Sequence, residues 1–338
     1  MTFMSTTGQA PVPSAGTSDS SGRLRMTPGR WAALAVAVPV ALALIGWTGF
    51  SLITTVARGS YPFSYAVPVQ DGQVAMNLTA GNVTLREAPG STTAQLTGVV
   101  QYGLVRPGIN ESLTPTGANF GVNCEDIMGT NCGVNAALDV PARTAVTLWS
   151  NGGNITASGF SSGMTLWAQG GNVAATNLAG NLQLDTGGGN LAATGLTGSL
   201  QIGTEGGNVG AGDWTSRSTM RVDTGGGDLN LNGLSGDLQL ATEGGNVDVS
   251  GMASRVVSMD SGGGDVTLAF TQVPQDLVIS AEGGNVTVIL PPGSTKYDIT
   301  TPDLAGGNPN YPSSLVDPKS PRKITINSGG GDVSISQG

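Results

Sequence analysis

Two glycines followed by Asn or Asp recur at a nearly constant spacing from residue 151 onward, and this repeat constrains the fold more than any other feature. The repeated positions are Asn154, Asn172, Asn190, Asn208, Asp228, Asn246, Asp265 and Asn285, which follow one another at intervals of 18 to 20 residues. A period this short is typical of a solenoid, in which each unit buries its apolar face only against neighbouring units. We therefore expect a stack of similar coils.

Apolar residues alternate with polar ones on both sides of each glycine corner. Leu229 and Leu231 follow one corner, and Leu238 and Leu240 precede the next, with Gln239 between them. An apolar period of two indicates strands with one buried face. The sequence thus predicts an all-β fold, a parallel single-stranded β-solenoid. A β-sandwich or a propeller is the alternative, although their units are longer or pair as hairpins with tight two-residue turns.

The acidic residues beside the glycines indicate how long one coil is. Asp223 precedes its corner, whereas Gly203 and Ala241 occupy the same position in the two flanking units. Glu205 and Glu243 occur instead in those flanking units, two positions further on. A coil made of two units would stack Asp on Asp at about 4.8 Å, where directly opposed like charges are destabilising. The pattern favours one unit per coil, about 18–20 residues.

This register aligns the residues after the glycines into a polar ladder. Asn and Asp side chains stacked in this way can bond to one another and to the corner backbone, while glycine supplies positive φ or close backbone approach. The predicted ladder consists of Asn190, Asn208, Asp228, Asn246, Asp265 and Asn285.

Calcium binding is the main functional alternative for the corners. Asp223 with Asp228, and Asp260 with Asp265, would supply some of the six to eight oxygens that calcium requires. The corners read GGGD or EGGN, however, and lack the GGxGxD spacing of calcium-binding β-rolls. We therefore expect no cofactor, with calcium at these four aspartates as the alternative.

The N-terminal region predicts a membrane anchor. Residues 1–30 are rich in Ser, Thr, Pro and Gly and are expected to form a disordered cytoplasmic tail. Residues 31–57 carry no charge, and 27 residues at about 1.5 Å each suffice to cross a hydrocarbon core of roughly 30 Å. Three arginines precede this span and only Arg58 directly follows it, which places the remainder of the chain outside the cytoplasm. A cleaved signal peptide is the alternative, although its apolar region is usually shorter.

The exported part is expected to contain a short linker and one domain. Residues 58–65 are the predicted linker, and residues 66–338 the β-solenoid. Proline-rich or irregular stretches interrupt the repeat at about 103–136 and 291–322, so both are interpreted as insertions or caps.

Cysteine content and charge limit the chemistry. Cys124 and Cys132 are the only cysteines, and in an oxidising compartment they predict a disulfide that closes a small loop. The chain has no His, so a Ser–His triad is excluded and a zinc site has few available ligands. A net charge of −9 with 14 scattered Lys and Arg argues against nucleic-acid binding.

Three stretches resemble a known family: LDVPARTAVTLWSNGGNITASGF, the recurrent GG(N/D) strands, and VTVILPPGSTKYDITT. Together they are similar to the bacterial DUF4097 family, whose members are called “putative adhesin”, over roughly residues 66–338. The resemblance implies a β-helical extracytoplasmic domain, frequently behind a transmembrane helix, and implies no established catalytic site. The segment between Cys124 and Cys132 departs from the family pattern.

The resulting hypothesis is a non-catalytic, membrane-anchored cell-surface protein of adhesin type, with a cell-envelope glycan or a surface protein as its partner. An envelope-stress sensor is one alternative. A polysaccharide-active β-helix enzyme is another, but Glu205, Glu243 and Glu282 recur two coils apart and have no basic partner in the repeat. The sequence does not predict an oligomeric state.

Overall fold

The computed structural model describes residues 59–103, 105–115, 117–123 and 132–338. These residues belong to the second of two compact units, Ala57–Gly338. The predicted tail and membrane span, residues 1–30 and 31–57, lie outside the described residues. Within the described ranges, no helix has the length and apolar character that a membrane crossing requires.

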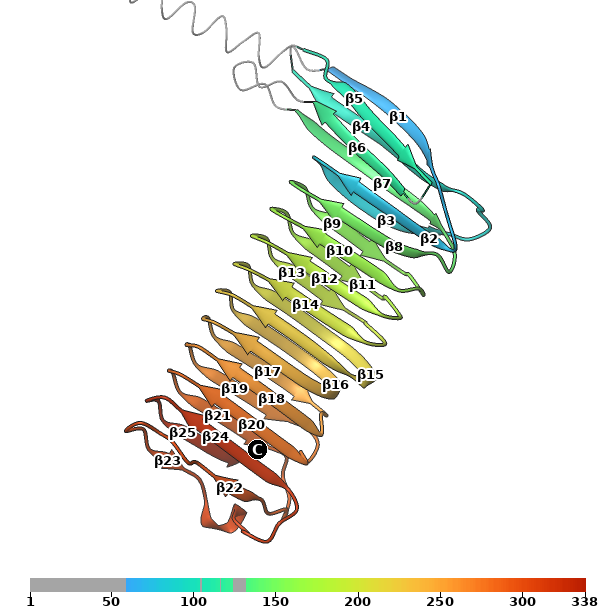
Figure 1. Ribbon diagram of the computed structural model, residues 1–338. Coiled ribbons are helices and arrows are strands. Elements are labelled where there is room, and N and C mark those ends of the chain that lie inside the picture. Colours follow the sequence, from blue (N-terminus) through green and yellow to red (C-terminus); the bar gives the residue numbers. More distant parts are fainter. Residues whose placement is uncertain (1–58, 104, 116, 124–131) are drawn as a thin grey trace, which may run out of the picture. The chain divides into compact units, whose positions relative to one another are not determined.

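The repeat folds into stacked parallel strands that form two faces (Figure 1). The first face contains β2 (Gln73–Leu78), β8 (Ala145–Ser150), β10 (Met164–Ala168), β12 (Leu182–Thr186), β14 (Leu200–Thr204), β18 (Val256–Ser261), β20 (Asp276–Ala281) and β24 (Lys323–Ser328). The second contains β3 (Asn82–Ala88), β9 (Ile155–Ser158), β11 (Val173–Thr176), β13 (Leu191–Thr194), β17 (Val247–Met252), β19 (Val266–Phe270), β21 (Val286–Leu290) and β25 (Val333–Gln337). Two long strands, β15 (Val209–Thr224) and β16 (Leu229–Thr242), turn from the second face to the first and join both into one sheet.

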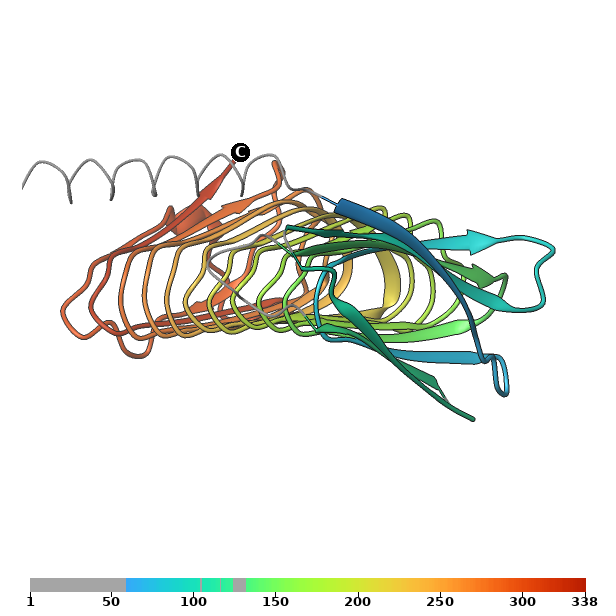
Figure 2. The same cartoon turned by 90° about the horizontal axis from the view of Figure 1, so that it is seen from above.

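The strand registers show the length of a coil. Leu182 of β12 pairs with Leu200 of β14, and Leu200 pairs with Met220 of β15, so neighbouring strands are 18 or 20 residues apart in the chain. Figure 2 shows successive coils as flattened loops lying over one another. The expected all-β, mostly parallel and solenoid-like fold is confirmed.

Alternating apolar side chains from both faces fill the interior of the coils. Leu184 on the first face and Leu231 on the second are completely buried, and their neighbours in the stack are also aliphatic. A third buried row follows the second face and consists of Phe160, Leu178, Leu196, Trp214 and Leu234. This third row did not enter the sequence analysis, because each coil contributes only one such residue and no local alternation marks it.

The N-terminal end of the stack is antiparallel, which differs from the purely parallel expectation. Strand β1 (Gly59–Val67) pairs with β4 (Ala94–Tyr102), β4 pairs with β7 (Gly133–Pro141), and β5 (Gly108–Thr114) pairs with β6 (Gly117–Asn123). Residues 59–65, expected to be a linker, are therefore part of a strand. Larger residues alternate with smaller ones along this strand, and Phe63 on the inward side is buried. Pro62 made this alternation hard to recognise as a strand in the sequence.

Both irregular segments are excursions between neighbouring coils. Strand β3 pairs directly with β9, so Asn82 and Asn154 belong to adjacent coils although they are 72 positions apart in the chain. Near the C-terminus, β22 (Asp298–Thr300) pairs with β24 and β23 (Pro309–Asn310) pairs with β25. The excursion also contains the short 3-10 helix η1 (Ser313–Leu315) and covers the last coil.

Candidate binding groove along the glycine corners

The last glycine of each corner is required by the closeness of the neighbouring coil. A Cβ added to Gly227 would lie less than 3.0 Å from the carbonyl oxygen of Gly207, a separation that real Cβ atoms essentially never show. A Cβ added to Gly226, by contrast, would meet nothing within 4 Å. The same close approach recurs at Gly153, Gly171, Gly189, Gly207, Gly245, Gly264, Gly284 and Gly331.

A buried hydroxyl fixes most of these corners from the inside. The Thr224 hydroxyl donates to the carbonyl oxygen of Gly227 at 3.1 Å. The Thr186 hydroxyl accepts from the Gly189 N–H at 3.2 Å and donates to the Gly171 carbonyl of the preceding coil at 2.7 Å. These bonds satisfy polar backbone atoms that the corner would otherwise leave unpaired.

The predicted ladder residues lie in one row, and each side-chain oxygen accepts a hydrogen bond from the backbone N–H of the next member. The Asn246 N–H donates to Asp228 Oδ1 at 2.8 Å, and the Asp265 N–H donates to Asn246 Oδ1 at 3.0 Å. The other donations between predicted members are from Asn208 to Asn190, from Asp228 to Asn208 and from Asn285 to Asp265. Both Asn and Asp can accept this hydrogen bond because the position needs only an acceptor oxygen.

The ladder continues through both excursions. The Asn154 N–H donates to Asn82 Oδ1 at 3.0 Å although the two residues are 72 positions apart, and the Asp332 N–H donates to Asn285 Oδ1 at 3.1 Å across 47 positions. At the C-terminal end, Asn308 of the excursion donates to Asp332. Asp332 and Asn308 were not predicted as members, because their spacing departs from the period.

The four candidate calcium ligands lie on different parts of the corners. Asp223 bonds with Arg221 through both carboxylate oxygens, and Asp228 and Asp265 each use Oδ1 in the ladder. Asp260 lies on the first face in the row of Asp223, and the registers place Ala241 between them. Among the described residues, no three His, Cys, Asp or Glu side chains gather in a way that could hold a metal ion. Calcium binding stays a prediction.

The structure describes only one of the two cysteines of the predicted disulfide. Cys132 is disulfide-bonded. Cys124 lies outside the described residues, so the pairing between the two stays a prediction.

An open groove of about 760 Å³ runs along the first-face side of the corners, and we call it the corner groove. It extends over seven coils, from Trp167 on β10 to Glu282 after β20. Each of the six coils after Trp167 contributes one carboxylate to its lining: Asp185, Glu205, Asp223, Glu243, Asp260 and Glu282. The groove is therefore strongly acidic along its length.

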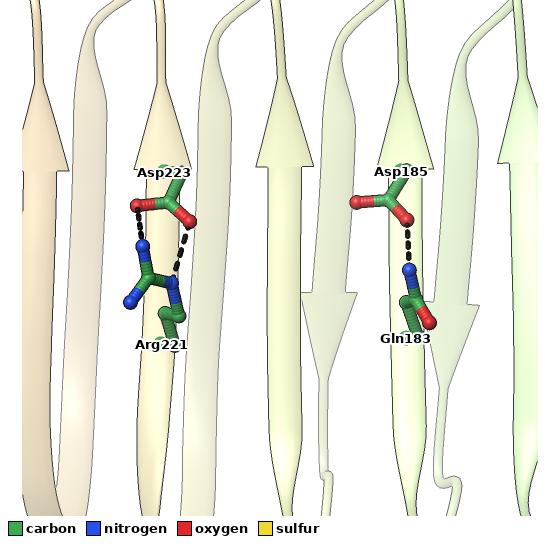
Figure 3. A network of polar contacts seen from close by, with 4 residues as sticks. All are labelled: Gln183, Asp185, Arg221 and Asp223. Carbon is green, nitrogen blue, oxygen red and sulfur yellow. Dashed lines mark hydrogen bonds and ion pairs between the residues drawn. The ribbon is translucent and has the colours of Figure 1, made fainter.

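Two of the carboxylates have close polar neighbours on their own strands (Figure 3). Gln183 Nε2 donates to Asp185 Oδ2 at 2.9 Å, and Arg221 Nε donates to Asp223 Oδ2 at 2.8 Å. Burial raises the pKa of Asp185 above its ordinary value, the Gln183 hydrogen bond lowers it, and the negative charge of Asp223 raises it. Although Gly203 separates the two aspartates in the stack, they still repel each other.

Two tryptophans occupy neighbouring positions on the first face, and Trp167 is the one that lines the N-terminal end of the corner groove. Trp149 on β8 pairs in register with Trp167 on β10, which in turn pairs with Asp185. Trp149 is 45% exposed, a large fraction for an indole, and within the described ranges neither indole contacts another aromatic ring. The row therefore offers aromatic faces followed by carboxylates. Neither tryptophan was predicted as a site residue, although their spacing of 18 was a usable signal.

A small pocket of about 140 Å³ lies on the other side of Trp149, against β2 and β6. It is lined in part by Asn77, Asn119 and Thr114. The Asn77 Oδ1 atom is buried and has no hydrogen-bond partner. Asn77 pairs in register with Trp149 and thus continues the row of the two tryptophans.

The stacked coils define an all-β, solenoid-like protein with an extended acidic groove on one face. The sequence profile of the Toastrack DUF4097 family matches residues 137–336, more than half of the chain, and the chain belongs to this family. This confirms the resemblance that the repeat indicated. No curated protein matches the chain.

Several solved structures are similar in fold. A “putative adhesin” from Parabacteroides distasonis aligns with a TM-score of 0.45 and 12% identity, covering 83% of this chain and 97% of that one. A “putative adhesin” from Parabacteroides merdae aligns with a TM-score of 0.38 and 12% identity, covering 84% of this chain and 97% of that one. A “putative lipid binding protein” from Parabacteroides distasonis aligns with a TM-score of 0.40 and 10% identity, covering 83% of this chain and 97% of that one.

Proposed function

We propose that the protein is a non-catalytic, membrane-anchored, extracytoplasmic protein of adhesin type whose corner groove binds an extended cell-envelope glycan. The observation that carries the proposal is the groove itself, which is open across seven coils and begins at the half-buried Trp167. Six strand steps of about 4.8 Å give a length of ~29 Å, enough for several units of a linear chain.

The side chains that line the groove favour a polymer that is neutral or carries amino groups. Indole faces bind apolar ring surfaces, and carboxylates and amides accept hydrogen bonds from hydroxyl or amino groups. Among the described side chains, the one cation paired with a groove carboxylate is Arg221, which is bonded to Asp223. Like-charge repulsion therefore disfavours phosphate-rich or other polyanionic ligands.

Membrane anchoring is a separate part of the proposal and rests on the charge-free segment 31–57. The first described strand, β1, begins at Gly59, two residues after that segment. A surface protein in place of a glycan, an envelope-stress sensing role and a polysaccharide-cleaving activity are alternatives. None of them is favoured by a specific feature of the groove.

The test measures binding of the full chain, purified in detergent, to isolated cell-wall polysaccharide. Trp167→Ala removes the aromatic face at the start of the groove and is expected to weaken binding by about tenfold or more, since aromatic anchors of binding sites are typically worth over 1 kcal/mol. Thr287→Ala is the matched control, because Thr287 points outward from β21 on the second face. Equal binding by the wild type and Trp167→Ala would refute the groove as the binding site.

A second measurement separates adhesion from sensing. Cells that produce the protein without residues 59–338 are expected to lose surface binding without a change in envelope-stress gene expression. Altered stress expression with unchanged binding would instead favour the sensor.

A further inference from the structure

An aromatic cluster with one arginine lies at the start of the first strand, and we call Tyr61, Tyr102 and Arg106 the Tyr61 cluster. The rings of Tyr61 on β1 and Tyr102 on β4 have centroids 5.9 Å apart. The Arg106 guanidinium lies 4.1 Å from the centroid of the Tyr61 ring, and the Tyr61 hydroxyl donates to the Pro107 carbonyl at 2.8 Å. The segment around Arg106 is therefore held against the beginning of β1.

Among the described residues, the charge of Arg106 has no carboxylate partner. Its side chain is exposed, and the one ion pair found in the described part of the chain joins Arg221 to Asp223. Val105 beside it is also exposed, at 46%. A shallow pocket of about 450 Å³ opens here and is lined in part by Tyr61, Tyr65 and Arg106. A free guanidinium among tyrosines is chemically suited to a phosphate group.

The position of the cluster in the chain limits its distance from a membrane. The predicted span ends at Ala57, and Tyr61 is four residues later. Four extended residues reach at most ~14 Å. The polar layer of each bilayer leaflet is roughly 5 to 8 Å thick. With the anchor of the proposed function in place, the Tyr61 backbone is within ~14 Å of the end of the span, a reach that includes the whole polar layer. Arg106 stays beside the Tyr61 ring.

We infer that the Tyr61 cluster docks on the bilayer surface, with Arg106 paired to the phosphate of anionic phospholipids. This inference rests on the membrane anchor of the proposed function but not on the glycan groove. Tyrosine rings suit the membrane–water interface because one end is apolar and the other polar. Basic residues close to the anchor gain free energy from anionic lipid, and exposed Val105 is able to contact the boundary of the acyl chains.

The test is hydrogen–deuterium exchange of the peptide that contains residues 105–109 in the full chain. The chain is placed in nanodiscs of phosphatidylcholine with phosphatidylglycerol, in nanodiscs of phosphatidylcholine alone, and in maltoside detergent. Exchange is expected to be about fivefold slower with phosphatidylglycerol than in detergent, as expected for one basic residue near an anionic surface. Phosphatidylcholine alone is expected to give a smaller effect.

Three variants assign the effect to the arginine. Arg106→Gln is expected to lose the protection by phosphatidylglycerol, and Arg106→Lys to keep most of it because the charge remains. Arg255→Gln is the matched control, since Arg255 is an exposed arginine in the turn before β18, remote in sequence from the anchor. Unchanged exchange of the core strands shows that each variant is folded.

Each contrary result has a distinct meaning. Equal exchange of the wild type and Arg106→Gln in all three environments would overturn the inference and leave the cluster with a packing role only. Protection by inorganic phosphate added in detergent would overturn the lipid as the ligand. Failure of the chain to remain in nanodiscs after carbonate washing would overturn the anchor itself, and this inference with it.

Discussion

The strongest test of the corner geometry compares alanine at two consecutive glycines, Gly227 and Gly226. At Gly227 the added methyl group would meet the carbonyl oxygen and carbon of Gly207 and the amide nitrogen of Asn208, all closer than 3.0 Å. These are backbone atoms of the adjacent coil, so no side-chain rotation relieves the overlap. The two coils have to separate locally.

The expected cost follows from what that separation breaks. Overpacking against rigid neighbours costs about 1 to 3 kcal/mol. The movement also strains the hydrogen bonds from the Asp228 N–H to Asn208 Oδ1 and from the Val209 N–H to the Asp228 carbonyl, of about 1 kcal/mol each. A loss of about 3 kcal/mol is therefore expected for Gly227→Ala. Gly226→Ala meets open space at a φ outside the left-handed region, so it is expected to be neutral or up to about 1 kcal/mol stabilising.

The assay is thermal unfolding of the full chain, followed by far-ultraviolet circular dichroism. A loss of 3 kcal/mol corresponds to a decrease of roughly 5 to 10 °C in the midpoint for a domain of this size. Gly226→Ala is expected within about 2 °C of the wild type or above it. Similar midpoints for the two variants would refute the claim that the neighbouring backbone, and not the turn, requires the last glycine.

Three further changes test the ladder, the acidic groove and the buried hydroxyls. Asn246→Asp places a carboxylate between Asp228 and Asp265 and is expected to cost about 1 kcal/mol at neutral pH, whereas Asn190→Asp, between two Asn residues, is expected to cost less than about 0.5. Denaturant unfolding at neutral pH measures this difference in the free energy of unfolding. Asp185→Asn is expected to stabilise the fold at neutral pH, because burial raises the pKa of Asp185 in the folded state and thus penalises its ionised form. In a denaturation series across pH, the gain in the free energy of unfolding should vanish below the ordinary pKa of 3.8. Thr224→Val removes the hydrogen bond to Gly227 and is expected to cost about 1 kcal/mol in denaturant unfolding, and an unchanged midpoint would contradict the role given to that hydroxyl.

The regular coils were predictable because each of their contacts repeats at one spacing. Once Leu182, Leu200 and Leu238 are recognised as equivalent, the strand direction, the buried face and the row of Asn and Asp follow from the same alignment. The reason for the corner glycines was less certain, since the sequence allowed either a positive φ or the close approach of a neighbouring backbone. The Gly207 backbone beside Gly227 decides for close approach at that corner.

The N-terminal strands could not be predicted in this way because their partners are set by tertiary contacts. Tyr65 of β1 pairs with Leu96 of β4, which pairs with Leu138 of β7, and no constant interval relates these residues. Trp149 and Trp167 had the right interval but were hidden among other outward residues. The exposure of Trp149 and the place of Trp167 in the groove are properties of the folded surface, not of the repeat.

The same close approach that requires glycine also fixes the geometry of the groove. Because the backbone of Gly227 contacts that of Gly207, the coils that carry Glu205, Asp223 and Glu243 cannot slide or spread independently. The carboxylates are therefore presented at intervals set by the strand spacing, about 4.8 Å per coil. A ligand whose repeat matches this spacing binds without any ordering cost in the protein. A ligand with a different repeat gains less, because the coils do not move to meet it. If the groove binds as proposed, Gly227→Ala should weaken polysaccharide binding even at temperatures where the variant remains folded, and Gly226→Ala should leave it unchanged.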